Sequence, residues 1–389
     1  MKITIATGPI FPVPAVRGGA VQRLWEGLAR EFVKRGYEVT IFAREFPGQA
    51  REETVGGIRY VRWGGYEQST SIRRDLLMCF LYAMRVARKV PRGDVVVTND
   101  FWMPAVLPWL KPSAGKVVVN ANRFPKNQYW LYGKAAAFAA ASAVVARTIK
   151  EQQPGAARRV MVVPNAIDDG FLVTLQAGAD REARRAGPTK ILYVGRIHPE
   201  KGLELLARAL RLLGERLEAA GKKPDGWECL LLGPMEQGAG GGGEKFVEEI
   251  KGLTAGLPLR FLPPVYEPDA LAAIYEGADL FVYPSVAERG ESFGIAPLEA
   301  MARGVVPVVS GLEVFREYIE PGVNGMVFDH RSAEAAENLA SALSDLIGDA
   351  DKRRRMGAAA RATAEKFSPA AIAHKYLQLF EKVLTGNVA

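Results

Sequence analysis

The sequence predicts an α/β protein built from two domains, each a doubly wound, Rossmann-like parallel sheet. Its 389 residues are enough for two or three domains with their own cores. Short apolar runs alternate with amphipathic helical segments, a pattern typical of a parallel sheet covered by helices on both faces. The alternation starts again after a polar, small-residue segment at 176–189. We therefore expect an N-terminal domain at residues 1–172, a linker at 173–189 and a second domain at 190–366. A C-terminal helix at 367–389 could pack back on the N-terminal domain.

In the first domain, the first strand and the first helix have the clearest patterns. An apolar run at 2–10 precedes an amphipathic segment at 18–36, which ends at Gly36, a residue type common at helix C-termini. A second helix is expected at 71–90. The remaining strands are expected at 37–43, 94–99, 116–122, 143–146 and 159–165.

The second domain repeats this order of strands and helices. Strands are expected at 189–196, 228–234, 259–265, 280–285 and 306–310. Helices are expected at 202–221, 245–256, 269–278 and 296–304, followed by a helical C-terminal stretch. In doubly wound sheets, ligands bind at the carboxyl ends of the strands, so the loops after the strands are where binding residues are sought.

Composition and cysteine content indicate a soluble cytoplasmic protein. Hydrophobic residues make up 48% and charged residues 24%, which is ordinary for a globular chain. Cys79 and Cys229 are the only cysteines, so no disulfide framework is indicated and a reducing cytoplasm is expected. The most apolar stretch, 135–146, has 12 residues and is too short to cross a bilayer.

Charge is distributed unevenly along the chain. Residues 1–170 contain 25 Lys and Arg against 13 Asp and Glu, a net charge of +12, whereas residues 171–389 contain 26 and 30, a net charge of −4. This asymmetry indicates an anionic partner for the first half, such as lipid headgroups, an acidic or phosphorylated acceptor, or nucleic acid. A basic surface that only aids solubility is the alternative.

Two basic segments are candidates for binding a partner. The helix at 71–90 has cations toward both ends and an apolar middle, so it could lie on the inner face of an anionic membrane, or bury its apolar side against the sheet. The run 352–356 is expected to be a solvated helix face. No nucleic-acid partner is therefore predicted.

The stretch ESFGIAPLE, residues 291–299, places two carboxylates around a loop-to-helix junction. Gly294 is a poor helix-interior residue and Pro297 suits a first turn, so we expect a loop at 291–294 and a helix from about Ile295. Glu291 would precede the helix and Glu299 would lie in its first turn. The unpaired N–H groups at the helix start, beside the positive end of its dipole, predict an anion site between the two acids.

A pair of cations follows the first strand of the second domain. Gly195, Arg196 and Lys201 lie in the segment YVGRIHPEKG, just before a helix. Arginine offers a bidentate fork for phosphate oxygens and lysine a point charge, although both cations could also be ordinary solvated loop residues. RGGAV at 17–21 has the same arrangement in the first domain. The three histidines are widely spaced, and no metal-ligand cluster is predicted.

GRIHPEKG, followed by DLFVYPSVAERGESFGIAPLEAMARG, resembles the signature of glycosyltransferase family 4. The opening residues of the chain and VVPNAIDDGF are similar to further segments of that family, so the resemblance covers nearly the whole chain. It implies the GT-B fold, in which two Rossmann-like domains face each other across a cleft. It also implies a retaining enzyme that moves a hexosyl group from a nucleotide sugar to a glycan, lipid-linked or small-molecule hydroxyl. UDP-glucose is the commonest donor in the family, and no cofactor or metal is expected.

The resemblance also implies roles for individual residues. Glu291 would contact donor-sugar hydroxyls near the reacting centre, and Arg196 and Lys201 would stabilise the leaving diphosphate, which makes these three the expected catalytic residues. Glu299 would bind the ribose and Gly19 the distal phosphate. The residues expected to bind the donor are Gly19, Gly195, Arg196, Lys201, Val265, Glu291, Ser292, Phe293, Gly294, Ile295 and Glu299.

One departure from the family pattern concerns the first domain. The family usually has a histidine after the strand expected at 116–122, but this sequence has no histidine before His198. The nearest matching positions are Asn120 and Asn122, with Asn99 and Asp100 ending the preceding strand. We expect Asp100, Asn122 and Arg123 to lie on the acceptor or sugar side. A sugar-nucleotide 2-epimerase and a non-catalytic nucleotide-sugar-binding subunit are the alternative functions.

Overall fold

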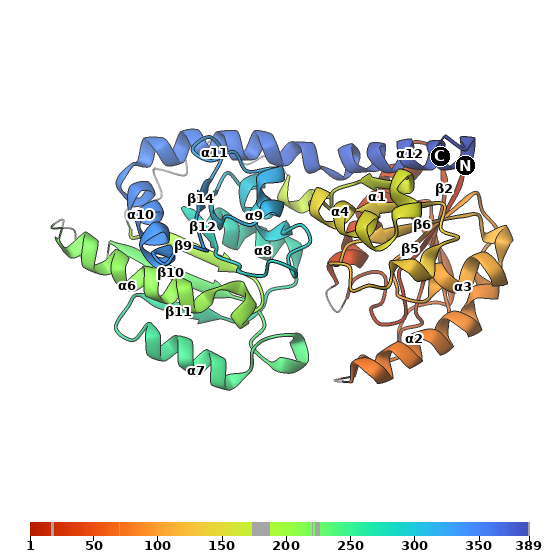
Figure 1. Cartoon of the computed structure of the whole chain (residues 1–389), viewed down its shortest axis with the longest axis horizontal. Coiled ribbons are helices and arrows are strands. Elements are labelled where there is room, and N and C mark those ends of the chain that lie inside the picture. The colour runs from red at the N-terminus through yellow and green to blue at the C-terminus, as the bar shows by residue number, and fades with distance from the viewer. Residues whose placement is uncertain (17–18, 70, 173–186, 220, 222–225, 388–389) are drawn as a thin grey trace. The chain divides into compact units, whose positions relative to one another are not determined.

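The computed structural model describes residues 1–16, 19–69, 71–172, 187–219, 221 and 226–387, which form two compact units (Figure 1). The first unit comprises Met1–Asp168 together with Phe367–Ala389, and the second comprises Asp169–Lys366. Most of the expected linker, residues 173–186, lies outside the described residues. Its last expected residue, Thr189, already begins a strand.

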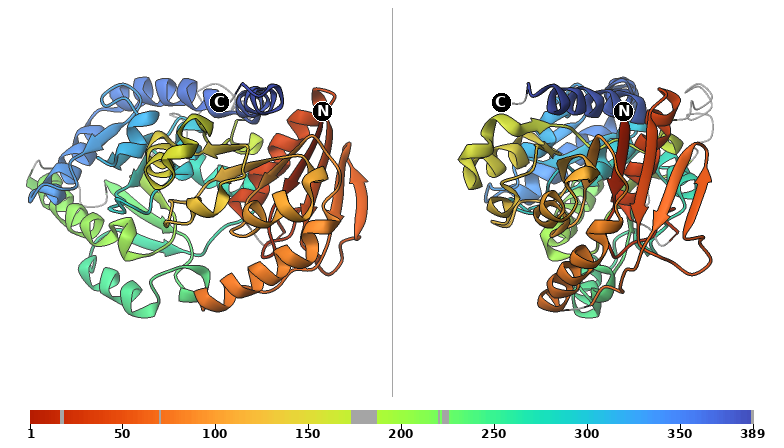
Figure 2. Two further views of the ribbon diagram at one scale, coloured as in Figure 1. Left: turned by 45° about the vertical axis from the view of Figure 1, so that its right-hand side comes forward. Right: turned by 90° about the vertical axis from the view of Figure 1, so that its right-hand side faces the viewer.

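Figures 1 and 2 show the first unit, in which helices pack against a sheet. This sheet has eight strands in the order β3-β4-β2-β1-β5-β6-β7-β8. All neighbouring strands are parallel except β3 and β4, which are antiparallel. The chain moves outward from β1 to β2 and later returns to the other side of β1 as β5, so the strand order reverses between β1 and β5. The strands are Lys2–Ala6, Glu38–Ala43, Glu52–Val55, Ile58–Arg62, Val95–Thr98, Lys116–Ala121, Ala137–Ala140 and Val160–Val162, from β1 to β8.

Helices cover both faces of this sheet, and alternate strand residues face the two layers. Val95 and Val97 belong to the core under α1 and α12, whereas Val96 belongs to the core under α2, α3 and α4. The C-terminal helix α12 lies along α1, where the rings of Trp25 and Tyr376 are 5.0 Å apart. The helices are Ala20–Lys34 (α1), Ile72–Val86 (α2), Met103–Leu110 (α3), Ala143–Gln152 (α4) and Pro369–Thr385 (α12).

The prediction of a strand at 143–146 is wrong. These residues begin helix α4, where the Ser142 side chain caps the helix by accepting a hydrogen bond from the Val145 N–H at 3.2 Å. The strand is instead the preceding four-residue run, Ala137–Ala140, which is completely buried. Alanine can fill the interior of a parallel sheet that is covered on both faces, just as valine can. Apolar character alone therefore could not locate the boundary between the strand and helix α4.

The second unit is a six-stranded, wholly parallel sheet in the order β11-β10-β9-β12-β13-β14. Its strands are Thr189–Val194, Trp227–Leu232, Leu259–Leu262, Leu280–Tyr283, Val306–Ser310 and Met326–Phe328, from β9 to β14. Its helices are Leu203–Ala219 (α6), Glu244–Leu253 (α7), Pro268–Glu276 (α8), Ile295–Ala302 (α9), Ala335–Gly348 (α10) and Ala350–Ala364 (α11). The strand order reverses between β9 and β12, which is where doubly wound sheets bind ligands. The prediction of two parallel-sheet domains is confirmed.

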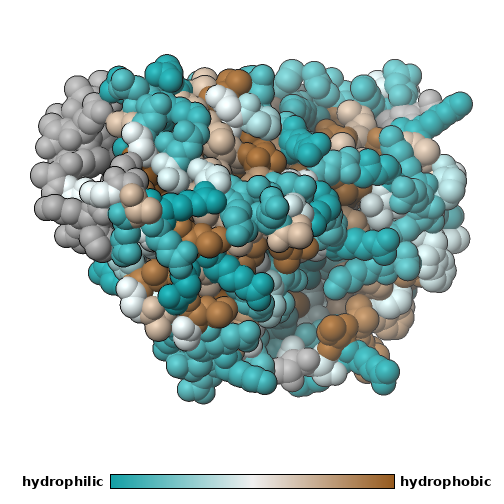
Figure 3. Space-filling view, turned by 60° about the vertical axis from the view of Figure 1, so that its left-hand side comes forward, coloured by the Kyte–Doolittle hydropathy of each residue, from teal (hydrophilic) through white to brown (hydrophobic). Residues whose placement is uncertain are grey.

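Figure 3 shows one face of the molecule, on which hydrophilic side chains predominate and hydrophobic ones form smaller groups. Among the described residues, no helix has the length and apolar character needed to cross a membrane.

Candidate active site

Two loops meet where the strand order of the second unit reverses. One follows β9 and carries Lys201, and the other follows β12 and leads into α9. They are joined by a backbone hydrogen bond from the Val286 N–H to the Glu200 carbonyl, 3.0 Å long. Gly202 makes this approach possible, because it has a φ of +69° and a Cβ there would lie 2.1 Å from the Pro284 carbonyl oxygen. The backbone hydrogen bond and the glycine therefore hold together two segments that are about 90 residues apart in the sequence.

A buried ion pair lies between these loops. The Lys201 Nζ is 2.8 Å from the Glu291 Oε2, and the two side chains are only 9% and 10% exposed. The ring of Tyr283, the last residue of β12, lies 5.3 Å from the same Nζ. Burial and the neighbouring Glu291 carboxylate raise the pKa of Tyr283 well above its usual range. Two of the three residues expected to be catalytic, Lys201 and Glu291, are thus brought together as an ion pair.

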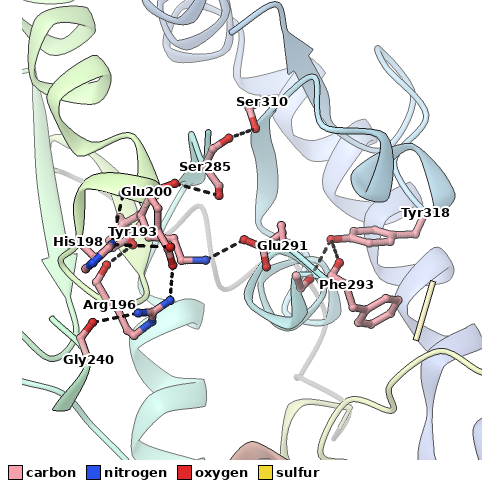
Figure 4. A network of polar contacts seen from close by, with 12 residues as sticks. Tyr193, Arg196, His198, Glu200, Gly240, Ser285, Glu291, Phe293, Ser310 and Tyr318 are labelled. Carbon is pink, nitrogen blue, oxygen red and sulfur yellow. Dashed lines mark hydrogen bonds and ion pairs between the residues drawn. The ribbon is translucent and has the colours of Figure 1, made fainter. Parts of the chain in front are cut away.

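Arg196 lies beside this pair but is held differently (Figure 4). Its guanidinium forms an ion pair with Glu200 and donates a hydrogen bond to the Gly240 carbonyl at 3.0 Å. Its own carbonyl accepts a hydrogen bond from the Tyr193 hydroxyl at 2.8 Å. Its side chain is 42% exposed, so Arg196 is more accessible to a ligand than Lys201.

The 291–299 segment has the expected loop and helix, with Gly294 as the N-cap of α9. Glu299 is the fifth helical residue, so it lies in the second turn and not in the first as expected, because one turn takes only 3.6 residues. Its carboxylate is buried and accepts a hydrogen bond from the Tyr275 hydroxyl at 2.9 Å. Within the described residues, no protein acceptor is hydrogen-bonded to the N–H groups of Ser292, Gly294 and Ile295.

The other expected donor residues of the second unit lie at the edge of this group. Gly195 follows β9 directly, and a Cβ at this position would lie 2.7 Å from the Tyr193 hydroxyl. Val265 is half-buried in the segment after β11. The tyrosines at 193, 275 and 283 and the acid Glu200 were not predicted from the sequence.

In the first unit, Gly19 is the N-cap of α1 with a φ of +109°. A Cβ there would lie 2.4 Å from the end of the Gln22 side chain, which could move aside, so it is the positive φ that favours glycine at this position. Arg17 and Gly18, which belong to the same expected phosphate-binding segment, lie outside the described residues.

The polar residues ending β5 and β6 divide into two groups. Asn99 and Asn120 belong to an internal network, in which the Asn99 side-chain oxygen accepts from Trp25 at 2.6 Å and from Asn120 at 2.7 Å. Tyr376 of α12 donates to the Asn120 oxygen at 3.0 Å. These two asparagines therefore have a structural role in tying α1 and α12 to the sheet.

Asp100 and Asn122 are different, because each has a buried side-chain oxygen that no group in the described part of the chain contacts by a hydrogen bond. The other Asp100 oxygen accepts from the N–H groups of Trp102 and Met103, at 3.0 and 2.7 Å. Burial raises the pKa of the Asp100 carboxyl to about 6. Arg123 is exposed. Asp100 and Asn122 therefore retain hydrogen-bonding capacity for a ligand, unlike Asn99 and Asn120.

The histidines are not arranged as metal ligands. His198 caps a short turn by accepting a hydrogen bond from the Glu200 N–H at 3.3 Å, and His330 contacts the Glu288 carboxylate at 2.9 Å. Across the described residues, no group of three or more His, Cys, Asp or Glu side chains could hold a metal ion.

Both halves of the sequence match models of glycosyltransferase families. Residues 179–363 match the family model of glycosyl transferases group 1, and residues 17–171 match that of glycosyltransferase family 4. The D-inositol 3-phosphate glycosyltransferase of Nocardia farcinica (strain IFM 10152) is 29% identical, over 98% of this chain and 89% of that protein. Spore coat protein SA of Bacillus subtilis (strain 168) is 27% identical, over 98% of this chain and 100% of that protein.

Among solved structures, Anabaena Alr3699/HepE in complex with UDP and glucose superposes with a TM-score of 0.71 at 18% sequence identity. The similarity covers 98% of this chain and 100% of that one. The two family models together span most of the sequence, one on each of the two parallel-sheet units. The chain therefore belongs to glycosyltransferase family 4, and it has the GT-B fold.

Proposed function

We propose that this glycosyltransferase moves a hexosyl group from a UDP-sugar to an acceptor hydroxyl, with retention of configuration and without a metal ion. The observation that carries the proposal is the arrangement of charge in the second unit. Lys201, Glu291 and Arg196 lie at the strand-order reversal, beside N–H groups of Gly294 and Ile295 that have no protein acceptor in the described residues. Such a set of donors and cations suits a sugar diphosphate. The UDP and glucose bound by the structurally similar Anabaena protein support the same donor class.

The cationic and acidic residues would have different roles. Breaking the bond between the anomeric carbon and oxygen develops negative charge on the diphosphate, and Arg196 and Lys201 would stabilise it. Glu291 would accept hydrogen bonds from sugar hydroxyls, and Glu299, already oriented by Tyr275, would accept them from the ribose. The diphosphate would share Arg196 and Lys201 with their carboxylate partners, and these two cations would take the place of a divalent metal.

Retention follows if the acceptor attacks from the face that the diphosphate leaves. In this mechanism a diphosphate oxygen takes the proton of the acceptor hydroxyl, so no protein base is required. Asn122, one of the two asparagines near the position where the family usually has a histidine, is compatible with this step, because an amide can hydrogen-bond a hydroxyl but does not titrate. The protein's remaining task would be to position the acceptor.

The acceptor would be a hydroxyl compound that carries an anionic group. The Asp100 and Asn122 oxygens would accept hydrogen bonds from its hydroxyls, and Arg123 would contact the anion. The net charge of +12 on residues 1–170 favours such a compound. The Nocardia farcinica relative, a D-inositol 3-phosphate glycosyltransferase by name, supports the same class of acceptor.

A donor and acceptor panel tests the proposed function. The protein would be incubated with labelled UDP-, GDP- and ADP-hexoses, with phosphorylated polyol and lipid acceptors, in the presence of EDTA. We expect transfer from a UDP-hexose to a phosphorylated acceptor, with the anomeric configuration retained by NMR. An acceptor-free epimer of the donor would instead indicate an isomerase, and binding without turnover would indicate a non-catalytic subunit. Transfer that requires magnesium or manganese would contradict the metal-free mechanism.

We also propose that the first unit contacts anionic membranes through α2. Ile72, Leu77 and Leu81 are 75%, 58% and 50% exposed on this helix, and Arg73 and Arg74 are exposed beside them. Exposed apolar residues flanked by cations suit the interface of an anionic bilayer. This contact would bring a lipid-linked acceptor to the enzyme.

Vesicle sedimentation tests the membrane contact. We expect the protein to co-sediment with vesicles that contain phosphatidylglycerol and to stay in solution with pure phosphatidylcholine. A Leu77→Glu/Leu81→Glu variant should lose this binding while keeping its far-UV circular dichroism. Equal sedimentation of the variant and the wild type would contradict an interface on α2.

A further inference from the structure

Tyr318 contacts the loop between Glu291 and α9 from the buried side. It follows the short helical turn Glu313–Glu317, and its side chain is almost completely buried. Its hydroxyl donates a hydrogen bond to the Gly294 carbonyl at 2.8 Å and lies 3.3 Å from the Phe293 carbonyl (Figure 4). Its ring packs against those of Phe293 and Phe315, with centroids 5.7 and 6.3 Å away.

The Gly294 carbonyl has an unusual donor for a helix N-cap. At α1, α7 and α8 the N-cap carbonyl accepts a hydrogen bond from the backbone N–H four residues later, at 3.1, 3.2 and 2.9 Å. At α9, none of the described backbone N–H groups donates to the Gly294 carbonyl, and the Tyr318 hydroxyl does so instead. The orientation of this peptide unit therefore depends on a side chain from another part of the fold.

Peptide geometry connects that contact to the opposite side of the loop. In a trans peptide the C=O and the following N–H point in opposite directions within one plane. The Phe293 carbonyl is coupled in this way to the Gly294 N–H, and the Gly294 carbonyl to the Ile295 N–H. These are two of the N–H groups for which the described structure contains no acceptor. Fixing the carbonyls on the Tyr318 side therefore directs both N–H groups away from Tyr318.

We propose that Tyr318 is a positioning residue of the active site, whose hydroxyl orients the 293–295 peptide units so that their N–H groups face the sugar diphosphate. The inference rests on the proposed function, since it assumes a nucleotide sugar at this loop. Tyr318 would not touch the substrate. Packing alone does not account for the hydroxyl, because a phenylalanine ring would fill the same space beside Phe293 and Phe315. Directing the N–H groups requires the hydrogen bond.

The test compares Tyr318→Phe with a matched control. Thr254→Val also removes a buried hydroxyl that donates to a backbone carbonyl, that of Ile250 at 2.8 Å, but at the end of α7. We expect Tyr318→Phe to weaken UDP-glucose binding about tenfold in calorimetry and to lower kcat, whereas the control keeps wild-type values. The inhibition constant of uridine, which lacks the diphosphate and the sugar, should not change. Both variants should show similarly small decreases in Tm.

Two results would overturn the inference. Wild-type affinity and kcat in Tyr318→Phe, with only a lower Tm, would show that the hydroxyl has a structural role alone. If Tyr318→Phe does not fold, 4-aminophenylalanine at position 318 restores a donor, and it should recover binding; failure to do so would contradict the mechanism. Absence of UDP-glucose binding by the wild type would reject the proposed function itself, a result distinct from a defect confined to the variant.

Discussion

Replacing Lys201 by methionine is expected to abolish glycosyl transfer and to lower the free energy of unfolding by about 3 kcal/mol. Methionine keeps most of the apolar stem but removes the charge that lies 2.8 Å from Glu291. The Glu291 carboxylate would then be left buried next to Tyr283 without its cation. Leaving one member of a buried ion pair uncompensated is among the most destabilising single changes. Urea unfolding measures the stability loss, and the transfer assay measures the activity loss.

A double variant separates the two effects. In Lys201→Met/Glu291→Gln both charges are absent, so stability should return to within about 1 kcal/mol of the wild type, whereas transfer should stay lost. Lys251→Met is the matched control, because Lys251 forms an exposed pair with Glu248 on α7. It should change stability by less than about 0.5 kcal/mol and leave transfer intact. Full activity in Lys201→Met would remove this lysine from the proposed site.

The elements that could be predicted from the sequence are those whose burial is visible as a run of apolar residues. Runs such as 94–99 and 306–310 correspond to β5 and β13, which are buried on both faces. The β3–β4 hairpin was not predicted, because β3 is almost wholly exposed and has no apolar alternation. The alanine-rich segment 135–146 contains both a strand and the start of a helix, and residue types that suit either structure could not locate the boundary between them.

The site residues that lie in glycine-containing or charged loops could be predicted from the sequence. The contacts that depend on the order of strands could not. Glycines and charges near strand ends pointed to Arg196, Lys201 and Glu291. The sequence did not show that β9 lies next to β12, and it is this strand order that pairs Lys201 with Glu291. Tyr283 and Tyr275 look like ordinary core residues in the sequence, since aromatic residues in strands and helices are usually buried. Their hydroxyl contacts exist only in the folded second unit.

Replacing Arg196 by methionine is expected to lower transfer about a hundredfold or more while changing stability by less than about 0.5 kcal/mol. The side chain is 42% exposed, so its contacts with Glu200 and Gly240 contribute little to folding. A diphosphate would need the guanidinium as charge builds on the leaving group. UDP binding should therefore weaken, whereas uridine binding should not. Arg211→Met is the control, since that guanidinium also donates to a backbone carbonyl, of Leu253 at 2.8 Å, but on the exposed side of α6.

A substitution at Glu200 should have the opposite effect on UDP binding to the substitution at Arg196. The Glu200 carboxylate pairs with Arg196, so a diphosphate bound by Arg196 would have to share or displace that carboxylate. Glu200→Gln removes the competing charge and keeps a hydrogen-bonding side chain of the same size. We expect it to strengthen UDP binding, and the gain should disappear in a Glu200→Gln/Arg196→Met double variant. Calorimetry at low and high salt measures both effects, because a gain that comes from charge should shrink as salt is added. If Glu200→Gln weakened UDP binding, the acid would be holding Arg196 in its binding position, and it would not be competing with the ligand.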